Sequence, residues 1–178
     1  MDSKKYFIGI VVPEPVFEKV EGIKQQLFEK HGLKGALRSP AHITLHRPFE
    51  WKEDKEEALI HKLRNFSFVK KFEIQLQNFD FFEPKVIFVD VLPNNGLLEL
   101  HDSLKNFAKK ELKLFNEVED IRGFQPHVTV ALRDLKKPKF YTLKKEFEAK
   151  TFSETFSFSD ISLLKLEKKW QVRVKFPI

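Results

Sequence analysis

The chain has 178 residues, of which 42% are hydrophobic and 33% charged, a composition unlike that of disordered, collagenous or coiled-coil proteins. No apolar run approaches the roughly 20 residues of a membrane-spanning helix, and Phe7–Val12 is too short for a secretory signal core. The absence of cysteine excludes disulfides, thiolate nucleophiles and thiolate metal sites. We therefore expect a cytoplasmic enzyme or binding protein.

The charge balance is basic, with a net charge of +6 and a pI near 9.3. A basic surface favours partners that carry phosphate and accelerates their encounter with the protein. The chain also has 20 phenylalanines and far more lysine than arginine, a bias that an AT-rich coding sequence would produce by itself. The charge is therefore only minor support for a nucleic-acid partner.

Apolar periodicity predicts the order strand, helix, strand, helix, strand for the first half of the chain. These elements are a strand at Tyr6–Val12, a helix opened by Pro13 and Pro15 and ended by Gly32, a strand at His42–Phe49 after a loop at Gly35–Ala41, a helix from about Asp54, and a strand at Phe72–Leu76. Proline is tolerated in the first turn of a helix, and glycine favours its end.

The second half repeats this order and adds one strand. Its elements are a strand at Val86–Val91, a helix capped by Asn95, a strand at His127–Leu132, a helix opened by Pro138, and strands around Phe156–Leu166 and Trp170–Phe176 joined at Lys168-Lys169. Val86–Val91 is apolar on both faces, as in a central, buried strand. We predict an α+β fold, with two pseudo-symmetric β-α-β-α-β halves, residues 1–82 and 83–178, as two lobes of a single domain.

One short motif occurs once in each half. Pro40–Leu45 (PAHITL) and Gln125–Val130 (QPHVTV) both read His-apolar-Thr-apolar shortly after a proline. Alternate residues of a strand share a face, so the histidine and threonine of each copy point one way and the apolar residues point the other. Their Cα atoms would lie roughly 6.6 Å apart, at about 3.3 Å per residue, so both side chains can reach one phosphate group.

Two such strands facing each other across a groove would combine the imidazoles of His42 and His127 with the hydroxyls of Thr44 and Thr129. Imidazole has an ordinary pKa near 6.5, so one histidine can activate a water while the other protonates a departing sugar oxygen. The threonines can donate to the non-bridging oxygens, where negative charge develops. This set suits phosphodiester hydrolysis without a metal, and especially a cyclic phosphodiester, whose leaving group stays tethered.

A single His-x-Thr on a strand is usually structural, but two copies at equivalent places in a repeat are much harder to produce by accident. With this double motif on the second strand of each half, the sequence resembles the two-histidine (2H) phosphoesterase superfamily, and within it the 2'-5' RNA ligase / RNA 2',3'-cyclic phosphodiesterase family. The resemblance implies a bilobal fold with mostly antiparallel sheets lining a central cleft. It also implies catalytic roles for His42 and His127 and phosphate binding by Thr44 and Thr129.

The same resemblance implies the substrate, an RNA end or a nucleotide that carries a 2',3'-cyclic phosphate. Members of the family open this ring to a 2'-phosphate, and some join or cleave 2'-5' linkages in RNA. It implies no cofactor and no metal, and we expect a monomer.

The sequence departs from the family at one position. Many members have an arginine five residues after the second histidine, where this chain has Leu132 followed by Arg133. The equivalent position of the first motif is Arg47. An odd offset turns a strand residue to the opposite face, so we keep Arg133, and after it Arg47, as further candidate phosphate ligands.

A metal site at the first motif is disfavoured by its strand geometry. His42 and His46 would lie roughly 13 Å apart on a strand, at about 3.3 Å per residue, too far for one ion, and we expect His46 at the rim of the groove.

Recognition of an RNA base would need aromatic rings on which the base can stack. The candidates near strand ends are Phe49, Trp51, Phe81, Phe82 and Phe124.

Two other functions remain open at the level of sequence. The same basic groove could hold an RNA end or a phosphorylated nucleotide without turning it over, as a binding module. A metal-dependent hydrolase is a third possibility, although the sequence lacks clustered carboxylates and thiols.

Overall fold

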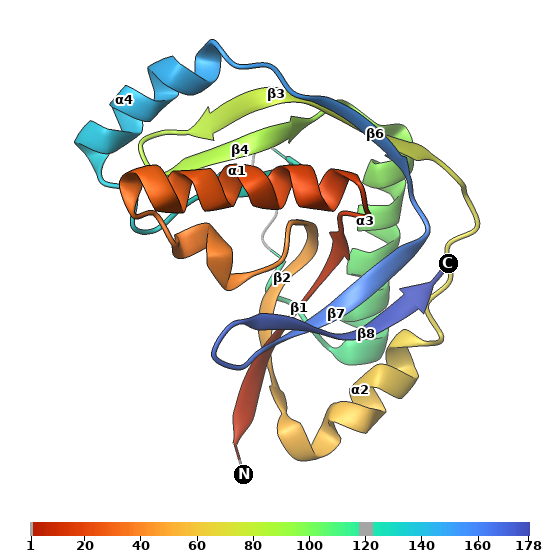
Figure 1. The fold of residues 1–178 in the computed structure, drawn as a ribbon. Helices are drawn as coiled ribbons and strands as arrows, with labels where there is room; N and C mark the ends of the chain where they lie inside the picture. Colours follow the sequence, from red (N-terminus) through yellow and green to blue (C-terminus); the bar gives the residue numbers. More distant parts are fainter. Residues whose placement is uncertain (1, 118–122) are drawn as a thin grey trace.

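Two four-stranded antiparallel sheets form the framework of the protein in a computed structural model that describes residues 2–117 and 123–178 (Figure 1). The first sheet has the order β2-β1-β7-β8, with β1 at Ser3–Val11, β2 at His42–Lys52, β7 at Asp160–Leu166 and β8 at Trp170–Pro177. The second has the order β5-β4-β3-β6, with β3 at Glu73–Phe82, β4 at Val86–Val91, β5 at His127–Ala131 and β6 at Ser153–Ser157.

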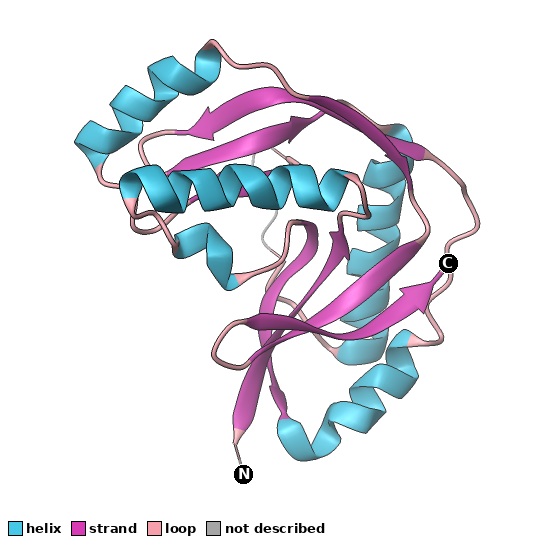
Figure 2. Ribbon diagram, in the orientation of Figure 1, coloured by secondary structure: helices cyan, strands magenta, loops and turns pink. Residues whose placement is uncertain are grey.

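The helices lie on and beside these sheets (Figure 2). They are α1 at Val16–His31, α2 at Glu56–Leu63, α3 at Asn95–Phe107 with a π-helical turn at Ala108–Leu112, and α4 at Lys137–Glu148, with short 3-10 helices at Gly35–Arg38 and Glu53–Lys55. Among the described residues, no helix is long and apolar enough to cross a membrane. The predicted α+β class and antiparallel sheets are confirmed.

Each sheet takes strands from both halves of the chain. β3 belongs to residues 1–82 but pairs with β4 and β6, whereas β7 and β8 belong to the second half but join β1. The halves therefore repeat the order of elements, while the two sheets exchange strands. The chain passes from the first sheet to the second between β2 and β3, and it returns between β6 and β7. These two crossings connect the lobes.

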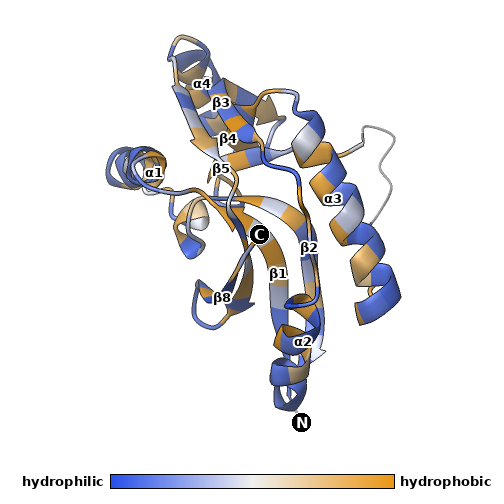
Figure 3. Cartoon of the chain, turned by 90° about the vertical axis from the view of Figure 1, so that its right-hand side faces the viewer, coloured by the Kyte–Doolittle hydropathy of each residue, from blue (hydrophilic) through white to orange (hydrophobic). Residues whose placement is uncertain are grey.

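The helices bury their apolar faces against the sheets. Along α3, hydrophobic and hydrophilic residues alternate (Figure 3), and Leu97, Leu100 and Leu104 are fully buried. β4 lies between β5 and β3, which confirms the prediction of a central strand. α1 ends at Gly32, whose φ of 68° is a left-handed conformation that favours glycine.

Several predictions of secondary structure need correction. The strand predicted around Phe156–Leu166 is two strands, β6 and β7, which lie in different sheets, so the second half adds two strands to the order of the first. The predicted loop Gly35–Ala41 contains a 3-10 helix over Gly35–Arg38. The cap of α3 is Asn94 rather than Asn95, because the Asn94 side chain accepts a hydrogen bond from the backbone N–H of Leu97 (3.0 Å). The Asn94 amide also donates to the carbonyl of Glu73, so this residue joins α3 to β3.

Replacing Asn94 with alanine should destabilise the protein, because one helical N–H loses its acceptor and the link to β3 disappears. We expect a cost of about 1 kcal/mol, or a fall in Tm of about 2–4 °C for a domain of this size. Asn95→Ala is the matched control and should change Tm much less. Equal effects of the two substitutions in thermal melts would contradict the assignment of the cap.

Candidate active site

The two repeated motifs meet in one cavity of about 240 Å³, which we call the histidine cavity. His42 and Thr44 reach it from β2, and His127 and Thr129 reach it from β5. The two strands belong to different sheets and come together where the lobes meet (Figure 3). The structure thus gathers two imidazoles and two hydroxyls around a single space.

Each histidine is oriented by the backbone two residues before it. The His42 Nδ1–H donates to the carbonyl of Pro40 (2.6 Å), and the His127 Nδ1–H donates to the carbonyl of Gln125 (2.7 Å). A carbonyl can only accept, so each bond holds the proton on Nδ1. In the neutral ring, Nε2 is then left with a free lone pair for proton transfer.

The segment before His42 is held by an ion pair on α1 between the buried Lys24 and the partly exposed Glu21. Lys24, only 2% exposed, donates from Nζ to Glu21 (2.9 Å) and to the carbonyl of Ser39 (2.9 Å). Glu21 also accepts from the backbone N–H of Ala41 (2.8 Å). These contacts fix the backbone on both sides of Pro40 and so the carbonyl that orients His42.

Aromatic rings flank both histidines. Phe7 lies 4.7 Å from His42 between ring centroids and 4.8 Å from Trp170. On the other side, Phe82 and Phe88 each lie 5.0 Å from His127. The rings restrict the motion of each imidazole and exclude water from one side of it.

The electrostatic surroundings of the two histidines differ. Burial lowers the pKa of His42 to about 4, and the nearby positive charges of Lys24 and His127 act in the same direction. Burial also lowers the pKa of His127, but there the carboxylate of Asp90 opposes the shift. Asp90 pairs with His127 directly across the β4–β5 ladder. A negative charge therefore favours the imidazolium of His127, and no equivalent carboxylate acts on His42 within the described residues.

Arg133 lines the histidine cavity because the chain turns sharply after β5. Arg133 adopts a left-handed φ of 69°, and the next residue, Asp134, donates its N–H to the carbonyl of Leu132 (2.9 Å). The Asp134 carboxylate then accepts from the backbone N–H groups of Lys34 (2.8 Å) and Gly35 (3.2 Å). This carboxylate joins the segment that follows α1 to the turn that follows β5, at the edge of the cavity.

Arg47 is placed differently from Arg133. It is not among the described residues that line the histidine cavity, and its guanidinium donates to the carbonyl of Asn116 (3.3 Å). The structure therefore does not bring Arg47 to the other candidate residues.

His46 was expected at the rim, but it is 1% exposed, so this prediction is wrong. A β-bulge between the pairs Ile8–His46 and Gly9–Thr44 interrupts the alternation of β2, and it buries Leu45 and His46 in succession.

Of the candidate base platforms, Phe49 is buried in the core. Phe81, Phe82 and Phe124 line a different cavity beside His127.

Several residues of the histidine cavity were not singled out in the sequence. Phe7, Arg38, Ser39 and Trp170 line it. A signal existed for Phe7, because it alternates with the core residues of β1 and so points away from them. Arg38 and Ser39 lie in the 3-10 segment and Trp170 on a C-terminal strand, and no local pattern links these positions to the motif.

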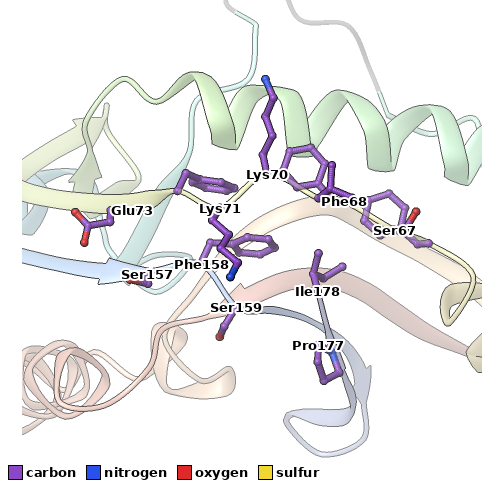
Figure 4. Close-up of a pocket in the computed structure, with 13 residues that line it drawn as sticks. Ser67, Phe68, Lys70, Lys71, Glu73, Ser157, Phe158, Ser159, Pro177 and Ile178 are labelled. Atoms are coloured by element: carbon purple, nitrogen blue, oxygen red, sulfur yellow. The ribbon is translucent and has the colours of Figure 1, made fainter.

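A larger cavity, of about 850 Å³, lies where the chain crosses between the sheets (Figure 4). Phe72 stacks on Phe158 with a centroid distance of 4.8 Å, and the Phe158 N–H donates to the Phe72 carbonyl (3.0 Å). Lys70 and Lys71 extend in opposite directions there (Figure 4). None of the described residues lining it is a histidine, and its contacts hold the two crossing segments together.

The described residues, 2–117 and 123–178, contain no group of three His, Asp or Glu side chains placed to hold a metal ion.

Comparison with known proteins identifies the family. The model of the 2'-5' RNA ligase superfamily matches residues 12–170. The chain belongs to this superfamily. A Bacillus licheniformis protein named as a phosphoesterase is 30% identical over 95 residues, which cover 52% of this chain and 52% of that protein. The match thus spans about half the length of that relative.

The fold of this superfamily member is similar to that of solved structures over nearly its whole length. Escherichia coli LigT in its apo form has a TM-score of 0.68 at 18% identity, covering 100% of this chain and 99% of LigT. A Thermus thermophilus protein has a TM-score of 0.62 at 21% identity, covering 97% of each chain. The predicted bilobal fold and the resemblance to the 2H phosphoesterases are confirmed.

Replacing Gly35 with alanine should disturb the packing of the 3-10 segment against the end of β5, because a Cβ at this position would lie 2.1 Å from the backbone oxygen of Leu132. We expect the free energy of unfolding to fall by about 1–3 kcal/mol. Gly22→Ala in α1 is the matched control, since a Cβ there meets nothing within 4 Å, and it should stabilise the helix by about 0.5–1 kcal/mol. Urea denaturation measures both, and a neutral Gly35→Ala would refute the close contact.

Proposed function

We propose that this protein is a metal-independent phosphodiesterase that opens 2',3'-cyclic phosphates at RNA ends to 2'-phosphates. The observation that carries the proposal is the pair of histidines, each with its Nδ1 proton held by a backbone carbonyl, in one cavity with two threonine hydroxyls. Two imidazoles of fixed tautomer can supply one general base and one general acid.

In the proposed reaction, water attacks phosphorus and a new P–O bond forms as the P–O3' bond breaks. His42 takes a proton from the water at Nε2, and His127 gives a proton from Nε2 to the departing 3'-oxygen. Thr44 and Thr129 donate to the non-bridging oxygens of the phosphate, where negative charge grows. The product carries a 2'-phosphate and a 3'-hydroxyl, and proton exchange with solvent restores the two histidines.

The surroundings of the histidines support this division of roles. A base must start neutral, and the pKa of His42 is lowered to about 4 by burial, with Lys24 adding to the shift. An acid must start protonated. Burial lowers the pKa of His127, and Asp90 across the ladder opposes this shift by favouring the charged form. With a 5'-hydroxyl in place of water, the same two groups would join RNA ends through a 2'-5' linkage.

A groove beside the histidine cavity supports RNA over a mononucleotide as the substrate. This basic groove, about 510 Å³ in volume, is lined by Lys34, Arg38, Arg133 and Lys169, and it shares Arg38 and Arg133 with the histidine cavity. Among the described residues, none of these four cations forms an ion pair. These unpaired cations adjoin the histidine cavity, so they can bind the phosphates of the nucleotides that precede the cyclic phosphate in the RNA strand.

LigT has been solved in complex with 3'-AMP and with NADP+. Nucleotide binding by this structural relative agrees with the proposed class of substrate.

Replacing His42 or His127 with alanine should each reduce turnover by at least a hundredfold, because each variant loses one proton-transfer group. The assay uses an oligoribonucleotide ending in a 2',3'-cyclic phosphate, with a chelator present, and separates the 2'- and 3'-phosphate products. His61→Ala, on α2, is the control and should keep full activity. Binding of the oligonucleotide without turnover by the wild-type protein would favour a binding module, and activity abolished by the chelator would favour a metal-dependent hydrolase.

Replacing Lys34 and Lys169 together with alanine should raise KM for the oligonucleotide severalfold and leave a 2',3'-cyclic mononucleotide unaffected. The salt dependence of log kcat/KM should become shallower by about 0.7 for each phosphate that the variant no longer neutralises. The double variant Lys136→Ala/Lys168→Ala removes the same charge from exposed positions outside the groove and serves as the control. Equal reductions on both substrates would argue against a strand-binding groove.

A further inference from the structure

A second cavity, of about 510 Å³, opens beside His127, and we call it the aspartate cavity. It lies between β3, β4, the first turn of α3 and the segment Phe124–Pro126. Phe82 and Phe88 form part of its wall, and both rings also lie 5.0 Å from the imidazole of His127. These two rings thus line the aspartate cavity and contact His127, which lines the histidine cavity, so a ligand bound at His127 can extend past them.

The wall of the aspartate cavity suits a flat, aromatic group. Phe82 lies over Phe88 with a centroid distance of 4.4 Å, and Phe82 is half-buried whereas Phe88 is buried. Phe124 stacks flat on His101, with 3.9 Å between centroids and 6° between planes. Leu98 adds an apolar side chain that is 43% exposed. Stacking of a nucleobase on such a surface contributes about 1–3 kcal/mol.

The polar side chains of this cavity are two carboxylates and the amides of Asn94 and Gln125. Asp80 and Asp90 both line it, whereas none of its described lining residues is a lysine or arginine. Each aspartate accepts one backbone N–H, from Phe81 (2.8 Å) and from Val91 (3.0 Å) respectively, through its Oδ1. In the described part of the chain neither aspartate has a salt bridge, so each Oδ2 is free to accept from a ligand.

The two negative charges also determine which part of a nucleotide can enter. They repel phosphate, so a phosphate group is directed to the histidine cavity and the basic groove. A neutral base with hydrogen-bond donors is attracted instead, since ionised carboxylates only accept hydrogen bonds. Burial and the charge of Asp80 raise the pKa of Asp90, although the Val91 N–H and His127 oppose this shift, so a further hydrogen-bond donor from a ligand would favour the charged form of Asp90.

The edges of the four RNA bases differ in the donors that they offer. Guanine presents N1–H and the N2 amino group side by side, so a single carboxylate can accept from both. Adenine and cytosine each present an amino group beside an acceptor nitrogen, which repels a carboxylate. Uracil presents one N–H between two carbonyl oxygens. A carboxylate at the Watson–Crick edge therefore favours guanine, and either Asp80 or Asp90 can supply it.

We propose that the aspartate cavity binds the base of the nucleotide that carries the cyclic phosphate, and that Asp80 and Asp90 make the enzyme prefer guanine there. This inference rests on the proposed function, in which His127 protonates the 3'-oxygen. The ribose that carries this oxygen then lies on the side of His127, from which its base extends past Phe82 and Phe88 into the aspartate cavity.

The test compares kcat/KM for the four nucleoside 2',3'-cyclic phosphates. Guanosine 2',3'-cyclic phosphate should be favoured at least tenfold over each of the others. Asp80→Asn should reduce this ratio at least threefold, since the amide keeps the shape of the side chain but loses its charge. Asp90→Asn should reduce the ratio as well and should also slow all four substrates, because Asp90 acts on His127. Asp54→Asn, exposed in the 3-10 helix that follows β2, is the matched control and should keep the ratio.

Equal kcat/KM for the four substrates, or a ratio that Asp80→Asn leaves unchanged, would overturn the inference while the proposed function stands. If none of the four is turned over, the comparison is repeated with four oligoribonucleotides that differ only in the base of the nucleotide carrying the cyclic phosphate. If these are not turned over either, the proposed function fails, and base preference is then measured by calorimetry with the four nucleoside 2'-monophosphates. Tighter binding of 2'-GMP that weakens in Asp80→Asn would support the aspartate cavity. Equal binding of the four nucleotides would overturn it.

Discussion

The hydrogen bond from each histidine Nδ1 to the carbonyl two residues before it is the interaction on which the site depends. It fixes the tautomer of His42 and of His127 and determines where each Nε2 points. The bond in turn requires a fixed backbone before each histidine. Lys24 and Glu21 hold that segment at Pro40, and the stack of Phe124 on His101 holds the segment next to Gln125.

The exchange of strands between the sheets brings the His42 and His127 segments to the same cavity. Because β3 joins the second sheet while β7 and β8 return to the first, the lobes are connected at two crossings of the chain. The two motifs are nearly symmetric, but their surroundings are not. Asp90 acts on His127 and Lys24 acts on His42, and this asymmetry can turn two equivalent imidazoles into one acid and one base.

The sequence predicts those features that depend on neighbouring residues. Alternation along the strand places His42 and Thr44 on one face, and Gly32 marks the end of α1. Features that depend on contacts with distant residues were either not predicted or predicted wrongly. The β-bulge that buries His46 arises from pairing with β1, and the choice of Asn94 as the cap involves its bond to Glu73 on β3. The approach of Arg133 to the cavity depends on a left-handed turn at a residue other than glycine, for which the sequence has no simple signal.

The division of roles between the histidines can be tested most directly with a cyclic substrate whose 3'-oxygen is replaced by sulfur. A thiolate leaves without protonation, because thiols have a pKa near 8.5, so this substrate bypasses the general acid. We expect His127→Ala to hydrolyse the sulfur substrate at nearly the wild-type rate, while His42→Ala stays inactive on both substrates. Rescue of His42→Ala but not of His127→Ala would reverse the assignment, and rescue of neither variant would contradict acid–base catalysis by this pair.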